Sequence, residues 1–211
     1  MTRSKQYLDI LPRFVQKFYK SYQNKKKKNK WIKEGKPIPV PHIIKQELIT
    51  EYKNKYDISI LVESGTYLGD MVWAQQENFD TIYTIELSKQ LHRQAEKRFR
   101  KKAHIHVLQG DSGKVMDTIV KEISDKAIFW LDGHYSGGIT ARGNMDCPIW
   151  EELKAILSTG TEHIILIDDA RLYIGERDYP SINGIKSYIR EQFPNSKIEV
   201  KNDCIIVELE K

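Results

Sequence analysis

The feature that most constrains the fold is a regular alternation of short apolar runs and helical patterns, from about residue 58 to residue 192. Strands that alternate with helices pair in parallel, because each helix carries the chain back across the sheet in a right-handed crossover. Near-continuous apolar strands also indicate that helices cover both faces of the sheet. The expected strands cover residues 58–62, 81–85, 104–108, 127–131 and 163–167.

The segments between these strands carry helix signals, and the end of the chain changes pattern. Ser88 can cap the helix that follows it, and further helices are expected over 69–77, 113–123, 148–158 and 182–192. Two β-type runs, 197–201 and 204–209, are separated only by Asn202-Asp203, which predicts a hairpin. The sequence therefore predicts a doubly wound, Rossmann-like α/β sheet that is mostly parallel, with a C-terminal antiparallel strand.

Residues 1–56 lack this alternation and predict a helical extension to a sheet domain that covers residues 57–211. Apolar spacing indicates an amphipathic helix over 1–23, interrupted near Pro12, and a second helix over 42–56. The segment 24–41 is rich in lysine and then in proline, so we expect a connector there. These N-terminal helices are expected to cover the edge of the site or to form the interface of a homo-oligomer.

Much of the net charge of +5 lies in the run Lys25-Lys26-Lys27-Lys28-Asn29-Lys30. Such a run either attracts nucleic acid, an anionic membrane or a polyanionic substrate, or is a solvated connector. The lack of an accompanying arginine or glycine–aromatic pattern favours the connector. No window is apolar enough to span a bilayer and the N-terminus does not resemble a signal peptide, so a cytoplasmic protein is expected.

Acidic residues follow all five expected parallel strands. Ligands of open α/β sheets bind outside the carboxyl ends of the strands, where these acids gather. One acid after a strand is ordinary turn chemistry, but five at corresponding places indicate a site. The five are Glu63, Glu86, Asp111, Asp132 and Asp168.

The turn after the first strand, Glu63-Ser64-Gly65-Thr66-Tyr67-Leu68-Gly69, differs from the dinucleotide fingerprint G-x-G-x-x-G. It is similar to the E/D-x-G-x-x-x-G form of motif I in class I S-adenosylmethionine (SAM)-dependent methyltransferases, although two glycines also suit an ordinary turn. Glu86 can accept hydrogen bonds from ribose hydroxyls, as an acid in an NAD site would. Gly110-Asp111-Ser112 resembles the methyltransferase motif beside the adenine, but Asp111 can equally cap a helix.

This resemblance extends over residues 58–209 and includes the order of elements and the reversed last strand, which NAD-binding folds lack. It implies SAM as the cofactor, with its methionine end near Glu63, its ribose on Glu86 and its adenine near Asp111. The cofactor-binding residues that the resemblance implies are Glu63, Gly65, Thr66, Gly69, Glu86, Asp111, Ser112 and Asp132.

Asp132, Asp168 and Asp169 end neighbouring strands of the expected sheet. Three converging carboxylates repel one another unless they are protonated or bind a cation, and oxygen ligands suit Mg²⁺ or another divalent cation. The arrangement resembles metal-dependent small-molecule O-methyltransferases of the catechol and macrocin O-methyltransferase type. In those enzymes the ion binds a substrate hydroxyl and lowers its pKa. Alternatively, Asp168 and Asp169 cap a loop and Asp132 contacts cofactor or substrate without a metal.

The loop after the fourth strand falls where this fold binds substrate. His134 is a candidate general base beside Asp132, or else a metal ligand or a partner of the loop backbone. Tyr135 and Arg142 are candidate substrate contacts, although Arg142 can instead pair with Asp146, and Arg171 is a third candidate.

These features together predict an O-methyltransferase for a hydroxyl of a small molecule or sugar-bearing metabolite, assisted by a divalent cation. The first alternative is a nucleic-acid methyltransferase that uses the lysine-rich segment, against which stands the absence of an N-P-P-Y-type motif. The second is a non-catalytic nucleotide-binding or interaction domain, because fold alone does not fix function.

Overall fold

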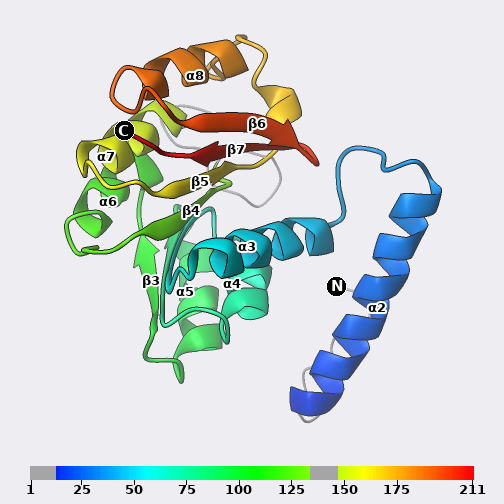
Figure 1. Cartoon of the computed structure of the whole chain (residues 1–211). Coiled ribbons are helices and arrows are strands. Elements are labelled where there is room, and N and C mark those ends of the chain that lie inside the picture. Colours follow the sequence, from blue (N-terminus) through cyan, green and yellow to red (C-terminus); the bar gives the residue numbers. More distant parts are fainter. Residues whose placement is uncertain (1–12, 134–146) are drawn as a thin grey trace. The chain divides into compact units, whose positions relative to one another are not determined.

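The computed structural model describes residues 13–133 and 147–211, and its centre is one seven-stranded sheet (Figure 1). The strand order is β3-β2-β1-β4-β5-β7-β6, in which β1 to β5 are parallel and β7 runs antiparallel to both β5 and β6. The predicted sheet and its reversed last strand are therefore confirmed. The strands are β1 (Ile60–Ser64), β2 (Thr81–Glu86), β3 (Ile105–Gln109), β4 (Ala127–Leu131), β5 (Ile164–Ile167), β6 (Lys197–Lys201) and β7 (Cys204–Glu208).

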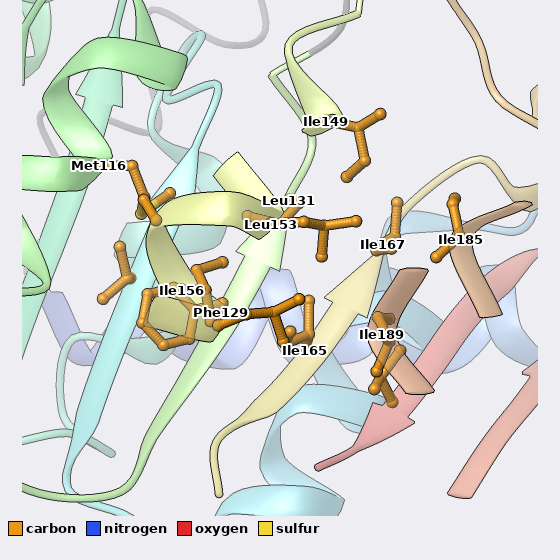
Figure 2. Close-up of a cluster of buried hydrophobic side chains, with 14 of the residues drawn as sticks. Met116, Phe129, Leu131, Ile149, Leu153, Ile156, Ile165, Ile167, Ile185 and Ile189 are labelled. Carbon is orange, nitrogen blue, oxygen red and sulfur yellow. The ribbon is translucent and has the colours of Figure 1, made fainter. Parts of the chain in front are cut away.

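Helices cover both faces of the sheet, as a doubly wound fold requires. The strand β4 shows this directly, since Phe129 packs in one buried cluster and its neighbour Trp130 in the other. Figure 2 shows the first cluster, in which β4 and β5 meet side chains from three helices, α6, α7 and α8. The helices of the sheet domain are α4 (Asp70–Gln75), α5 (Lys89–Phe99), α6 (Ser112–Ile119), α7 (Ile149–Ser158), η1 (Ala170–Leu172) and α8 (Ile182–Arg190).

Side-chain caps fix where several of these helices begin. The backbone N–H of Leu91 donates to Ser88 Oγ at 3.4 Å, so the predicted cap of α5 is confirmed. Asp111 caps α6 by accepting from the N–H of Gly113 at 3.1 Å, and Ser181 caps α8. Ser88 and Asp111 come just after the ends of β2 and β3. These two caps therefore place the starts of α5 and α6 at the edge of the sheet where those strands end.

The chain divides into two compact units, residues 1–47 and 48–211, so the division falls within α3 (His42–Tyr56) and earlier than the expected boundary after residue 56. In the first unit, α2 runs from Arg13 to Lys33. The expected connector over 24–41 is therefore wrong for residues 24–33, which are helical. Lysine is a good helix former, and no glycine or proline occurs from Arg13 to Glu34, before Gly35, whose φ of +80° ends the helix.

The end of α2 is held by a small core of its own unit. Trp31 is buried with Val40 and Ile44, and its Nε1 donates to the carbonyl of Pro37 at 2.7 Å. An ion pair joins Lys28 of α2 to Glu47 of α3, at 2.7 Å. None of the helices in the described parts of the chain is long and apolar enough to cross a membrane.

Candidate functional site

Hydrogen bonds between strand ends bring the predicted site residues to one edge of the sheet. The N–H of Asp132 donates to the carbonyl of Ser64 at 3.1 Å, and that of Asp168 donates to the carbonyl of Leu131 at 3.0 Å. The N–H of Gly110 donates to the carbonyl of Glu86 at 3.0 Å. The carboxyl ends of the parallel strands therefore meet in register, as the sequence predicted.

The glycines of the first turn each have a positive φ and a close neighbour that leaves no room for a side chain. Gly65 has φ +86°, and an added Cβ would lie 2.2 Å from the carbonyl oxygen of Asp132. Gly69 has φ +72°, and its Cβ would lie 2.8 Å from the ring of Phe99. The turn after β1 therefore packs directly against the end of β4, and its backbone is left without side chains at both glycines.

Glu63 is a buried carboxyl group that accepts a hydrogen bond from Thr84, which is itself hydrogen-bonded to Thr66. Thr84 donates its hydroxyl to Glu63 Oε2, and the hydroxyls of Thr66 and Thr84 lie 2.6 Å apart. Burial raises the pKa of Glu63 to about 8; the nearby charge of Glu86 adds to this, and the hydrogen bond from Thr84 opposes it. The group is therefore mostly protonated at neutral pH. Thr84 is absent from the sequence prediction, although it is the register partner of Glu63 on β2.

Glu86 is held in place by two backbone amides. Its Oε2 accepts from the N–H of Tyr67 at 2.7 Å, and its Oε1 accepts from the N–H of Ser88 at 2.8 Å. The side chain is buried between the first and second strand–helix turns. Each carboxylate oxygen can accept a second hydrogen bond, so this group can bind the two hydroxyls of a ribose.

A second polar group surrounds Gly133, just after β4. An added Cβ on Gly133 would lie 3.0 Å from Ser64 Oγ, 3.1 Å from Ser112 Oγ and 3.2 Å from Glu152 Oε1. Ser64 Oγ is buried and has no hydrogen-bond partner among the described residues. Sequence reasoning did not assign Ser64, Gly133 or Glu152 to the site. For Glu152 the reason is that a glutamate in the first turn of a helix such as α7 has no distinctive signal.

Asp169, just after β5, has a cationic partner, Arg171, which was expected to contact the substrate. Arg171 Nη1 donates to Asp169 Oδ1 at 2.8 Å and also to Asp203 Oδ2. Asp203 lies in the turn between β6 and β7 and accepts from the backbone N–H of Arg171 at 3.0 Å. Hydrogen bonds of Arg171 therefore connect the turn after β5 to the C-terminal hairpin of β6 and β7.

The predicted metal set does not form as expected. Among residues 13–133 and 147–211, no group of three or more His, Cys, Asp or Glu side chains is placed to hold a metal ion. Asp168 is fully buried, whereas the carboxylate of Asp169 is paired with Arg171. The repulsion among the carboxylates, which suggested a metal, is reduced by the guanidinium of Arg171, two residues after Asp169. His134, Tyr135 and Arg142 lie outside the described residues.

Comparison with known proteins identifies the fold. The chain matches no protein-family model and no curated protein. It is similar to the S-adenosylhomocysteine-bound methyltransferase PaMTH1 of Podospora anserina, with a TM-score of 0.59, 15% identity, and coverage of 96% of this chain and 99% of that one. It is also similar to the SAM-bound O-methyltransferase TomG of Streptomyces achromogenes, involved in tomaymycin synthesis, with a TM-score of 0.56, 13% identity and 89% coverage of each chain. The chain therefore has the class I methyltransferase fold.

Proposed function

We propose that this chain is a SAM-dependent O-methyltransferase that acts on a hydroxyl of a small molecule or sugar-bearing metabolite. The observation that supports the proposal most strongly is the carboxylate of Glu86, which accepts hydrogen bonds from two backbone amides. It lies beside the first turn, where two glycines have no side chain to cover the backbone. The two relatives bound to SAM or S-adenosylhomocysteine support the same choice of cofactor.

The residues at the edge of the sheet fit such a cofactor. Glu86 would bind the ribose, and its charge would disfavour a 2′-phosphate. Asp111 and the buried Ser112 would lie beside the adenine, near the hydroxyl of Ser64, which has no hydrogen-bond partner among residues 13–133 and 147–211. Glu63 would accept from the ammonium of the methionine end, because a nearby cation favours the ionised form of a carboxyl group. When bound, the cofactor supplies an electrophilic methyl group.

The chain's part in the reaction is to align a hydroxyl with that methyl group and to remove its proton. His134 with Asp132 remains our candidate for proton removal, and Tyr135 and Arg142 remain candidate substrate contacts. The predicted cation does not fit the described carboxylates, because Asp169 is engaged by Arg171.

Turnover tests this proposal. Purified protein would be incubated with SAM and a panel of hydroxylated phenols, sugars and glycosides, and formation of S-adenosylhomocysteine and O-methyl product would be measured by mass spectrometry. Each reaction would be run with a chelator and with added Mg²⁺. We expect O-methylated product in both conditions.

The other outcomes are equally informative. Product only with Mg²⁺ would restore the divalent cation of the sequence prediction. Cofactor binding without any product over a broad panel would favour the non-catalytic alternative. Transfer to a nitrogen or carbon atom would contradict O-methylation while leaving the cofactor in place.

A further inference from the structure

We propose that the C-terminal half of α2 is a binding surface for the sugar–phosphate backbone of nucleic acid. The helix carries nine of the 34 lysines and arginines of the chain and none of its 29 aspartates and glutamates. The remainder of the chain therefore has a net charge of −4, although the whole is +5. The positive charge of this protein is thus concentrated on one helix. This observation does not depend on the proposed methyltransferase site.

The lysines of this segment are available to a partner. Lys25, Lys26, Lys27, Lys30 and Lys33 are all exposed. Within the described parts of the chain, Lys25, Lys26 and Lys27 form no ion pair, and Lys30 has only a loose pair with Glu34 at 3.7 Å. Lys28 is the exception, because it is paired with Glu47.

The helical form of the run makes a solvated connector a poor explanation. In a helix, Lys26 and Lys30 lie one turn apart on the same side, as do Lys30 and Lys33, and like charges at these spacings destabilise a helix. A bound polyanion would neutralise this repulsion and release the counterions of its own phosphates. The ordered array is thus suited to an anion with regularly repeated charges.

The distribution of the lysines favours nucleic acid over a membrane. Four consecutive residues of a helix point to all sides, since each is turned by about 100° from the last. The run Lys25–Lys28 therefore surrounds α2, whereas a helix that lies on a bilayer needs a continuous apolar face. A helix in a groove of nucleic acid meets phosphates on both sides. Tyr22, 62% exposed one turn before the run, adds a ring for stacking or for hydrogen bonding to phosphate.

Fluorescence anisotropy of the full chain with labelled duplex DNA and an RNA hairpin tests the proposal. The test variant replaces Lys25, Lys26, Lys27 and Lys30 with glutamine, which has a similar helix propensity. The matched control makes the same change in charge at four exposed lysines of the second unit, Lys97, Lys101, Lys114 and Lys154. We expect the test variant to bind about tenfold or more weakly, with a salt slope lower by about 3 to 4 on duplex DNA, and the control to bind nearly as wild type.

A further variant, Asn29→Pro, keeps every charge but interrupts the helix. We expect it to weaken binding as well, and circular dichroism would verify that the glutamine variant remains helical. Equal losses in the test and control variants, or full binding by Asn29→Pro, would overturn a helical binding surface. Binding to phosphatidylserine vesicles with no binding of either nucleic acid would overturn the choice of partner. All these outcomes are independent of methyl transfer.

Discussion

At the scale of single residues, the site contains one carboxyl group, that of Glu63, whose protonation differs from that of the same group in water. Glu63 has a pKa of about 8, because it is buried, whereas an unfolded glutamate has one near 4.5. The folded state therefore holds a proton that the unfolded state has lost between these two values. Stability from this group is present below pH 4.5 and is lost as the pH rises towards 8, by about 1.4 kcal/mol per pH unit.

Glu63→Gln tests this assignment, because the amide keeps the shape of the protonated acid. We expect the free energy of unfolding of the variant, measured with urea from pH 5 to 8, to fall less steeply than that of wild type. We also expect the variant to bind SAM more weakly, since it cannot ionise beside an ammonium group. Parallel pH profiles for the two proteins would show that Glu63 is already ionised in the folded state.

His163 has the opposite effect and lies just before β5, away from the candidate site. Its Nδ1 accepts from the N–H of Ala127 at 3.1 Å and its ring lies against Phe129, and burial lowers its pKa to about 4 from 6.5. The unfolded state binds more protons between these values, so stability is lost as the pH falls from 6.5 towards 4.

We expect His163→Asn to have a flatter stability profile than wild type between pH 4 and 6.5. The asparagine carbonyl can still accept from Ala127, but the smaller side chain should cost about 1 to 2 kcal/mol at pH 7. Urea unfolding across this range is the measurement. A variant that loses stability on acidification as steeply as wild type would rule out His163 as the source. The pH ranges in which His163 and Glu63 change the stability overlap, and their effects have opposite sign. The contribution of each residue is therefore measured as the difference between its variant and wild type.

Gly65 offers a prediction that joins a backbone contact to the site. Gly65→Ala would place a methyl group 2.2 Å from the carbonyl oxygen of Asp132, at a φ of +86°. Gly160→Ala is the matched control, because its φ is +68° but its nearest other atom is 3.5 Å away, at the end of a lysine. We expect the control to lose about 1 kcal/mol of stability and Gly65→Ala at least about 2 kcal/mol more, with loss of SAM binding. Thermal unfolding and calorimetry of the two variants would show equal effects if the contact were unimportant.

At the scale of elements, the turn after β5 depends on a residue 32 positions later in the chain. Arg171 bridges Asp169 and the buried Asp203, and breaking such a pair leaves a charge without its partner. We expect Arg171→Ala and Asp203→Asn each to cost about 2 to 3 kcal/mol, and the double variant to cost clearly less than their sum. Chemical denaturation of all four proteins completes this cycle. Additive losses would show that the two side chains act independently.

The elements show where sequence reasoning succeeds and where it fails. Strands, caps and the C-terminal hairpin follow from local patterns, so Ser88 and the reversed β7 were predictable. The helix over Lys25–Lys30 was not, because a lysine run suits both a solvated helix and a connector, and the buried Trp31 that anchors it depends on residues further along the chain. β1 begins and ends two residues later than predicted, since Glu63 and Ser64 continue the ladder although they are polar.

The candidate site divides in the same way. Its acids and glycines were predictable, because they follow strand ends that the parallel sheet must bring together. The partnership of Arg171 with Asp203 was not predictable, since it is a contact between distant segments of one edge. For the same reason, the sequence predicted a metal ion at Asp169, whereas in the structure the guanidinium of Arg171 pairs with this carboxylate.

At the scale of the whole molecule, the chain keeps the topology of class I methyltransferases at 15% identity or less to the two relatives described above. What this chain shares with those two structures is the fold. The central claim is that this edge, through Glu86, binds SAM.

Titration calorimetry with SAM, S-adenosylhomocysteine and NAD tests this claim most directly, on wild type, on Glu86→Ala and on Glu191→Ala, a control at an exposed residue just after α8. We predict micromolar binding of the first two ligands to wild type and to the control, no binding of NAD, and a loss of about tenfold or more in Glu86→Ala, because hydrogen bonds to a charged group contribute about 1.5 to 3 kcal/mol. Failure of folded, ligand-free wild type to bind either SAM or S-adenosylhomocysteine would contradict the account, as would equal affinities in all three proteins.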